Sequence, residues 1–165
     1  MPYNYRDFWK NTRFGGVPDH NYDEFILSVL EPGSVLDVGC GAGRFVETLS
    51  KDHAYVGIDI SESAINQAKE DYPEQVFSVK DIVKDKIGMQ FDNVFTWTAL
   101  EHIPPENIKA VANKLKKAAK KNIIICEPHN EGELAEHCFS HDYDSLFKVE
   151  KKIDLGSVVI YKCGK

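Results

Sequence analysis

Short apolar runs of strand length alternate along this chain with segments in which apolar residues recur at helical spacing. Five strands are predicted, over residues 34–37, 54–59, 76–79, 91–95 and 122–126. Helices are expected over residues 44–51, after an N-cap at Ser61, and from Pro104 and Pro105 to about residue 120. Alternation of this kind predicts a parallel sheet with helices on both faces.

The C-terminal segment departs from this alternation. Residues 146–154 and 157–162 are strand-like runs, joined at Leu155 and Gly156 with no room for a crossover helix. Two strands with so short a join pair antiparallel. The predicted fold is therefore an α/β three-layer sandwich, whose doubly wound, mostly parallel, seven-stranded sheet ends in an antiparallel hairpin. No repeat or Pro/Gly-rich linker divides the sequence, so residues 1–165 are expected to form a single domain.

The composition argues against nucleic acids and membranes as partners of this chain. The net charge of −6 at pH 7 and the pI near 5.5 argue against the basic footprint that nucleic-acid binding usually needs. No apolar run approaches the ~20 residues of a membrane-spanning helix, and the aromatic, polar N-terminus does not resemble a signal peptide. A cytoplasmic protein with neither a nucleic-acid nor a membrane partner is expected. None of the four cysteines forms a C-x-x-C pair with another. This pattern predicts buried thiols in a reduced compartment. The cysteines are Cys40, Cys126, Cys138 and Cys163.

A glycine-rich turn follows the first predicted strand, in the run V-L-D-V-G-C-G-A-G-R-F that starts at Val35. Gly39, Gly41 and Gly43 allow a tight turn and a close approach of the backbone to a ligand. The spacing is G-x-G-x-G, whereas a dinucleotide fingerprint needs a third glycine at the position that Arg44 occupies. A turn that only packs the strand against the next helix is the alternative.

This run resembles motif I of the class I S-adenosylmethionine-dependent methyltransferases, of the small-molecule type 11 and 25 kind. The resemblance continues through later motifs and covers roughly residues 30–126. It implies that the glycine turn cradles the methionine part and the ribose of S-adenosylmethionine. The residues expected to bind the cofactor here are Asp37, Gly39, Cys40, Gly41 and Gly43.

Two further acids end the next two predicted strands. By the resemblance, Asp59 accepts hydrogen bonds from the ribose hydroxyls and Ile60 covers one adenine face. Asp59 is also suited to stabilise the start of the following helix. Asp81 is implied to accept from the adenine amino group, and the backbone N–H of Ile82 to reach the ring. An Asx turn at the strand end is the alternative for Asp81.

The segment F-D-N-V-F-T-W-T-A-L-E-H-I-P resembles the fourth-strand segment of the same family. The resemblance implies an elbow at Trp97 near the sulfonium, so Thr96 and Trp97 are expected cofactor residues. An aromatic ring attracts a sulfonium cation, although core filling explains Trp97 as well. Glu101 and His102 are expected to lock the turn rather than to ligate a metal.

Methyl transfer is an in-line displacement that depends mainly on alignment, and a base is needed only when the acceptor must lose a proton. His129 and His141 are the candidate bases, because histidine titrates near neutrality; turn-holding roles are the alternative. Glu133, His137 and His141 recur every four residues, as metal ligands on one helix face would. The Asp-Tyr pair that follows makes a continuous helix doubtful there, and no metal is expected.

The first 30 residues are rich in aromatic side chains with arginines between them: Tyr3, Tyr5, Arg6, Phe8, Trp9, Arg13, Phe14 and Tyr22. The predicted organisation is a lid or substrate segment over 1–30, a cofactor-binding core over 31–127, and a substrate-side loop with the hairpin over 128–165. No insertion is long enough for a separate substrate domain. The acceptor is therefore expected to be a small molecule, unless a second copy or a partner protein completes the pocket. A cofactor-binding module without catalysis, and a less favoured NAD-dependent oxidoreductase, are the competing hypotheses.

Overall fold

The computed structural model describes residues 4–10, 17–129 and 134–165. The expectations for Tyr3, Arg13, Phe14 and Glu133, and for the side chains of Tyr5 and Arg6, lie outside what it describes.

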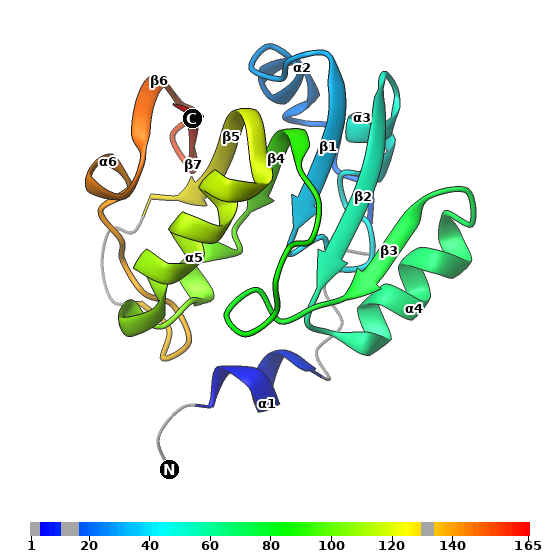
Figure 1. Cartoon of the computed structure of the whole chain (residues 1–165), viewed down its shortest axis with the longest axis horizontal. Helices are drawn as coiled ribbons and strands as arrows, with labels where there is room; N and C mark the ends of the chain where they lie inside the picture. Colours follow the sequence, from blue (N-terminus) through cyan, green and yellow to red (C-terminus); the bar gives the residue numbers. More distant parts are fainter. Residues whose placement is uncertain (1–3, 11–16, 130–133) are drawn as a thin grey trace.

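Seven strands form a single sheet in the order β3-β2-β1-β4-β5-β7-β6 (Figure 1). The strands are β1 (Gly33–Val38), β2 (His53–Asp59), β3 (Val76–Val79), β4 (Phe91–Trp97), β5 (Ala119–Pro128), β6 (Lys148–Asp154) and β7 (Val158–Gly164). The first five pair in parallel, and β7 pairs antiparallel with both β5 and β6. This arrangement confirms the predicted sheet and its C-terminal hairpin.

The helices cover both faces of the sheet. They are α1 (Tyr5–Lys10), α2 (Asp23–Leu27), α3 (Val46–Ser50), α4 (Glu62–Asp71), α5 (Pro105–Ala118) and α6 (Tyr143–Leu146), with a 3-10 helix η1 (Leu100–His102). On one face, α5 buries Ile108, Val111 and Leu115 against β1, β4 and β5. On the other face α2, α3 and α4 bury a second core, to which they contribute Ile26, Leu49 and Ile65. The molecule is thus the predicted three-layer sandwich.

Local sequence explains where α4 and α5 begin. The Ser61 hydroxyl accepts from the N–H of Ala64 at 3.2 Å, so Ser61 caps α4 as predicted. Helix α5 begins at Pro105, whose missing N–H is not needed in a first turn.

Several boundaries differ from the sequence-based expectation, and three of the differences have a clear structural reason. Helix α3 begins at Val46 rather than at residue 44, because residues 41–45 continue the glycine turn. Helix α5 ends at Ala118 rather than near residue 120. Strand β5 begins at the next residue, Ala119, which pairs with Phe91 of β4. Residue 146 belongs to the short helix α6 and not to the hairpin. Each of these three differences arises where a tertiary contact or a turn overrides the local propensity.

The β3–β4 connection contains no helix. Its carbonyl groups are held by α5, because the Lys114 ammonium donates to the carbonyls of Ile82, Val83 and Asp85 at 2.9, 2.6 and 2.8 Å. All four cysteines are free thiols, as predicted, and three of them are buried. None of the helices in the described part of the chain has both the length and the apolar character that crossing a bilayer requires.

Candidate functional site

A cavity of about 430 Å³ lies beyond the carboxyl ends of β1, β2, β3 and β4. Its volume falls in the range of roughly 300–1,000 Å³ found for small-ligand sites. The strand order reverses direction between β1 and β4, which is where ligands bind in sheets of this type. Most of the residues predicted to bind the cofactor line this cavity: Asp37, Gly39, Cys40, Gly41, Asp59, Ile60, Asp81, Ile82 and Trp97.

The glycine turn uses its glycines for different purposes. Gly39, Gly41 and Gly43 have φ angles of +76°, +54° and +99°, which side-chain-bearing residues rarely adopt. A Cβ at Gly39 would lie 2.6 Å from the Cβ of Ala99, and one at Gly43 would lie 2.9 Å from the Tyr72 ring. Gly43 does not line the cavity. Its predicted contact with the cofactor is therefore not supported, and packing against Tyr72 explains this glycine.

Asp59 connects the end of β2 to the glycine turn. Its two carboxylate oxygens accept from the N–H of Gly41 at 2.9 Å and from the N–H of Ser61 at 2.8 Å. Burial raises the pKa of Asp59, and these backbone donors oppose the increase. A carboxylate offers about four acceptor positions, so Asp59 can also accept from a hydroxyl in the cavity.

Asp37 is a second, more deeply buried carboxyl group, with 2% of its surface exposed. Burial raises the pKa of Asp37 to about 7; the hydrogen bond from the Tyr55 hydroxyl, at 2.9 Å, lowers it, and the charge of Asp59 raises it. A cation bound beside Asp37 would favour the ionised form.

Asp81 forms the Asx turn that the sequence offered as the alternative, and it also lies at the cavity wall. Its Oδ1 accepts from the N–H of Val83 at 3.0 Å, which is an Asx turn. The residue also lines the cavity, as do its neighbours Lys80 and Ile82. The turn therefore positions Asp81 at the cavity wall and does not exclude a contact with a ligand.

The end of β4 forms the predicted elbow. Thr98 has a φ of +45° and is the only non-glycine residue with positive φ in the described part of the chain. Its N–H donates to the carbonyl of Cys126 at 2.7 Å. Trp97 packs against Phe45 and Tyr22, with ring centroids 4.5 and 4.7 Å away, and it also lines the cavity. Strain of this kind clusters at functional sites.

Thr96 does not reach the cavity, contrary to its predicted role. It is fully buried in the sheet between Val38 and Ile125, and its Oγ1 has no hydrogen-bond partner among the residues that the structure describes. Successive side chains of a strand face opposite sides of the sheet. Trp97 faces the other way from Thr96, and of the two it is Trp97 that lines the cavity.

A buried carboxyl group that was not predicted holds the turn after the elbow. Glu127, at 1% exposure, accepts from the N–H groups of Ala99, Leu100 and Glu101 at 3.2, 3.0 and 3.2 Å. Burial raises the pKa of Glu127 to about 8; the charge of Glu101 adds to this increase, and the three N–H donors oppose it. Glu127 is thus a positioning residue for η1, whose residues line the cavity.

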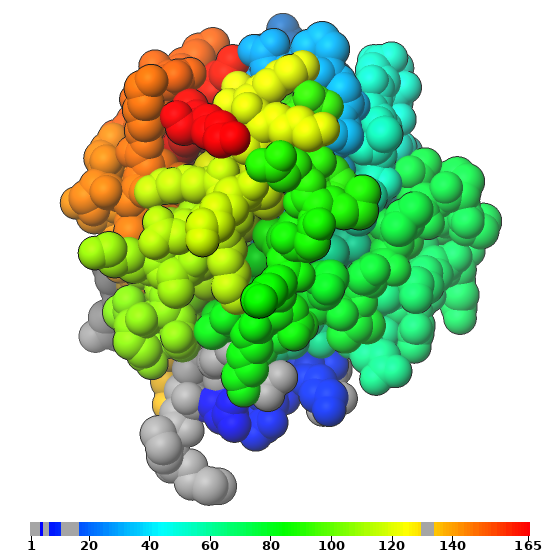
Figure 2. Space-filling view, in the orientation of Figure 1, coloured from blue at the N-terminus to red at the C-terminus, as the bar shows by residue number. Residues whose placement is uncertain are grey.

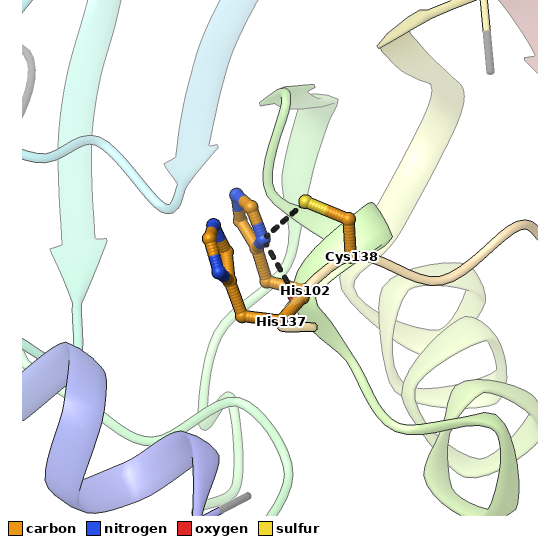
Figure 3. Close-up of side chains that lie close together, drawn as sticks. All are labelled: His102, His137 and Cys138. Carbon is orange, nitrogen blue, oxygen red and sulfur yellow. Dashed lines mark hydrogen bonds between the residues drawn. The ribbon is translucent and has the colours of Figure 1, made fainter. Parts of the chain in front are cut away.

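Two histidines and a cysteine lie close together at the cavity wall. His102 Nδ1 lies 3.0 Å from the carbonyl oxygen of His137, which can only accept, and 3.7 Å from the Sγ of Cys138 (Figure 3). All three residues line the cavity. Burial lowers the pKa of His102, which favours the neutral ring, and raises the pKa of the Cys138 thiol to about 11.

Helix α1 packs on these histidines. The Trp9 ring lies 4.2 Å from the ring of His102, and the Phe8 ring stacks on that of His137 at 4.9 Å. Figure 1 shows α1 at the end of the molecule toward which β1 and β2 point. Figure 2 shows the same helix in dark blue. Trp9 lines the cavity. These contacts support the hypothesis that the N-terminal segment is a lid.

His129 and His141, the predicted bases, do not line the cavity. His129 pairs with Asp154 at 2.9 Å, beside the turn of the hairpin. His141 Nε2 donates to the carbonyls of Leu100 and Ile103 at 3.1 and 3.0 Å, which fixes both ends of η1. The expected catalytic roles are not supported, and turn-holding contacts explain both histidines.

Among the residues that shape the site, Arg44 and Glu127 were not assigned from the sequence. Arg44 lines the cavity, but in the sequence it served only to exclude a dinucleotide fingerprint. The sequence did contain a sign of the role of Glu127, because this acid ends an apolar run just before Pro128. A carboxyl group buried at such a place needs hydrogen-bond donors. Its donors come from residues 26 to 28 positions away, which no local pattern reveals.

Comparison with known proteins agrees with this geometry. The family model described as a methyltransferase domain matches residues 35–122, more than half of the chain. A protein of Invertebrate iridescent virus 6, provisionally named a methyltransferase, is 30% identical over 154 residues, which are 89% of this chain and 57% of the viral protein. The ubiquinone biosynthesis O-methyltransferase of Coxiella burnetii is 38% identical over 94 residues, which are 52% of this chain and 40% of that enzyme. The chain thus spans about half the length of these curated relatives.

The fold also matches solved structures. The magnesium protoporphyrin IX methyltransferase of Synechocystis, solved with bound SAH, superimposes with a TM-score of 0.69 at 18% identity, over 87% of this chain and 83% of that one. An identity this low shows the fold alone. Together with the matched family model and the cavity at the strand ends, it leads to one conclusion: the chain belongs to the class I S-adenosylmethionine-dependent methyltransferases.

Proposed function

We propose that this protein transfers the methyl group of S-adenosylmethionine to a small-molecule acceptor. The observation that carries the proposal is the convergence of Asp37, Asp59 and Asp81, from three neighbouring strand ends, on one cavity. S-adenosylmethionine is a cation with ribose hydroxyls and an adenine amino group, so a wall with several carboxylates suits it. The strained elbow at Thr98 lies in the same wall.

The side chains of the cavity fit the parts of the cofactor. Asp59 would accept from the ribose hydroxyls, Asp81 would face the adenine amino group, and Ile60 and Ile82 would cover the adenine ring. Beside the glycine turn, cationic Arg44 suits the carboxylate of the methionine part, and Asp37, which a bound cation would ionise, suits its ammonium.

When bound, the cofactor supplies a methyl group on a sulfonium, ready for in-line displacement. The protein then has to align an acceptor and exclude water, and positioning supplies much of the rate. Trp9, Leu100 and Ile103 give the acceptor side of the cavity an apolar lining. The names of two compared proteins refer to ubiquinone biosynthesis and to magnesium protoporphyrin IX, which supports a small-molecule acceptor for this chain as well.

The test has two stages. Calorimetry with S-adenosylmethionine, S-adenosylhomocysteine and NADH should show binding of the first two ligands and not of the third. Release of S-adenosylhomocysteine is then measured against a panel of small hydroxyl, amine and thiol compounds. The matched control is His129→Ala, which changes an imidazole outside the cavity and should alter neither result.

Each outcome separates the hypotheses. Binding of NADH alone would replace the proposal by the oxidoreductase hypothesis. Tight binding of S-adenosylmethionine without release of product across the whole panel would favour a cofactor-binding module without catalysis.

A further inference from the structure

We propose that His102, His137 and Cys138 form a binding site for a zinc ion, or a zinc-like divalent transition metal, on the acceptor side of the cavity. One ligand atom from each side chain lies within 4.8 Å of the other two. The site goes beyond the proposed methyl transfer and does not depend on it. It departs from the sequence-based expectation, in which no metal binds and His102 only locks the turn.

The donor set points to the class of metal. Imidazole nitrogen and thiolate sulfur are ligands of zinc and similar borderline ions, whereas magnesium and calcium prefer oxygen. Zinc bonds of about 2.0–2.1 Å to nitrogen and 2.3 Å to sulfur place two tetrahedral ligands ~3.5 Å apart. His102 Nδ1 and Cys138 Sγ are already 3.7 Å apart. Small side-chain rotations would bring in the third ligand, and His102 would exchange its bond to the His137 carbonyl for the metal.

The surroundings match those of a metal-bound histidine. With Nδ1 of His102 on the metal, its Nε2–H faces the carboxylate of Glu101, 3.8 Å away. A carboxylate behind a ligating imidazole is the usual outer partner in metal sites. The rings of the two histidines are packed by Trp9 and Phe8 of α1. Figure 3 shows both rings side by side, with the Cys138 sulfur turned toward His102.

Three protein ligands leave a tetrahedral ion with one open position. Structural zinc sites are normally closed by four protein ligands, whereas sites that take an external ligand keep one position open. The three ligating side chains all line the cavity, so the open position can face its interior. The ligand class expected there is an anionic oxygen or sulfur atom, such as a phenolate or a thiolate.

The experiment uses the full chain without a histidine tag, freed of metal with a chelator. Zinc affinity is measured by competition with a chromophoric chelator, and cobalt(II) serves as a spectroscopic probe because a thiolate ligand gives it a charge-transfer band. We expect one metal per chain and a thiolate–cobalt band. Cys138→Ser should abolish the band, and His102→Ala or His137→Ala should weaken zinc binding at least tenfold. The matched control is His129→Ala, which should bind zinc as the unmodified chain does.

A second measurement needs no variant. Cys138 is the one cysteine that is not buried, so an alkylating reagent should modify it first in the native protein. Zinc should slow that modification, as read by mass spectrometry, while the three buried thiols stay unreacted as an internal control. A Cys138 alkylation rate that zinc does not change, or a zinc affinity equal in all variants, overturns the proposal. Neither result affects S-adenosylmethionine binding, so the two proposals fail separately.

Discussion

At the scale of single residues, the site depends on carboxyl groups that are held by backbone donors. Asp59 accepts from Gly41 and Ser61, and these two bonds fix the orientation of its carboxylate before any ligand arrives. Asp37 is held by a side-chain donor instead, the Tyr55 hydroxyl. Groups fixed in advance lose little conformational freedom on binding, which favours affinity.

Asp59→Ala should weaken S-adenosylmethionine binding by about 1–3 kcal/mol. The substitution removes a charged acceptor and leaves the N–H groups that bonded to it without that partner. Isothermal titration calorimetry measures the change. Glu62→Ala is the matched control, since Glu62 is an exposed acid three residues further along that should leave the affinity unchanged. Equal affinities for both variants would refute the ribose assignment.

Asp37→Asn should flatten the dependence of stability on pH. The unfolded chain loses the Asp37 proton near its ordinary pKa of 3.8, whereas the folded protein keeps it to about pH 7. The folded state binds more protons in that window, so this group makes the free energy of unfolding fall as the pH rises, by at most about 1.4 kcal/mol per unit. Asparagine still accepts from Tyr55 and does not titrate.

Urea unfolding of both proteins at about pH 5 and about pH 7 tests this expectation. The free energy of unfolding of Asp37→Asn, relative to that of the unmodified protein, should increase with pH. A constant difference would show that Asp37 ionises equally in both states.

At the scale of elements, the glycine turn and the β4 elbow are built against each other. The missing Cβ of Gly39 gives Ala99 room to approach, and the adjacent Thr98 takes a positive φ. The Glu127 carboxyl group accepts hydrogen bonds from the three N–H groups that follow the elbow. The cavity wall therefore consists of two turns whose shapes are mutually dependent.

Alanine substitutions at three glycines should separate strain from overlap. Gly39→Ala combines a φ of +76° with a Cβ overlap at 2.6 Å and should destabilise most, by roughly 2–4 kcal/mol. Gly156→Ala has a φ of +83° in open space, so only backbone strain of about 1 kcal/mol applies. Gly88→Ala has neither problem and should be neutral or slightly stabilising. Thermal or urea unfolding gives the order, and Gly39→Ala as stable as Gly88→Ala would contradict the packing argument.

At the scale of the whole molecule, the C-terminal hairpin completes the sheet beside β5. Strand β7 lies between β5 and β6, and Ile160, which is fully buried, pairs with Cys126 on one side and Ile153 on the other. Its side chain belongs to the core that α2, α3 and α4 cover. The hairpin is thus expected to unfold together with the cofactor-binding half.

Ile160→Ala should lower the free energy of unfolding by about 2–5 kcal/mol, the usual effect of such a cavity. The urea transition should stay single with an unchanged slope, because one cooperative unit unfolds. Lys151→Ala, at an exposed position of β6, is the control and should change little. Early loss of the hairpin alone, with S-adenosylmethionine binding retained, would show instead that the hairpin is an independent unit.

Sequence alone was enough to predict the strand–helix alternation, the antiparallel tail and the glycine turn, because periodicity, caps and turn residues act over a few positions. These features also identified Asp37, Asp59 and Asp81, since the end of each parallel strand falls at one edge of the sheet. The family resemblance then gave each acid an expected partner.

Which side chains face the cavity could be seen only in the folded chain. In the structure Thr96 is buried inside the sheet. His129 and His141 make contacts that hold turns. His137 and Cys138 lie beside His102. The structure also showed that Glu127 supports a turn more than twenty positions earlier in the chain. Contacts of this length depend on how the layers pack, and no local pattern of residues encodes that packing.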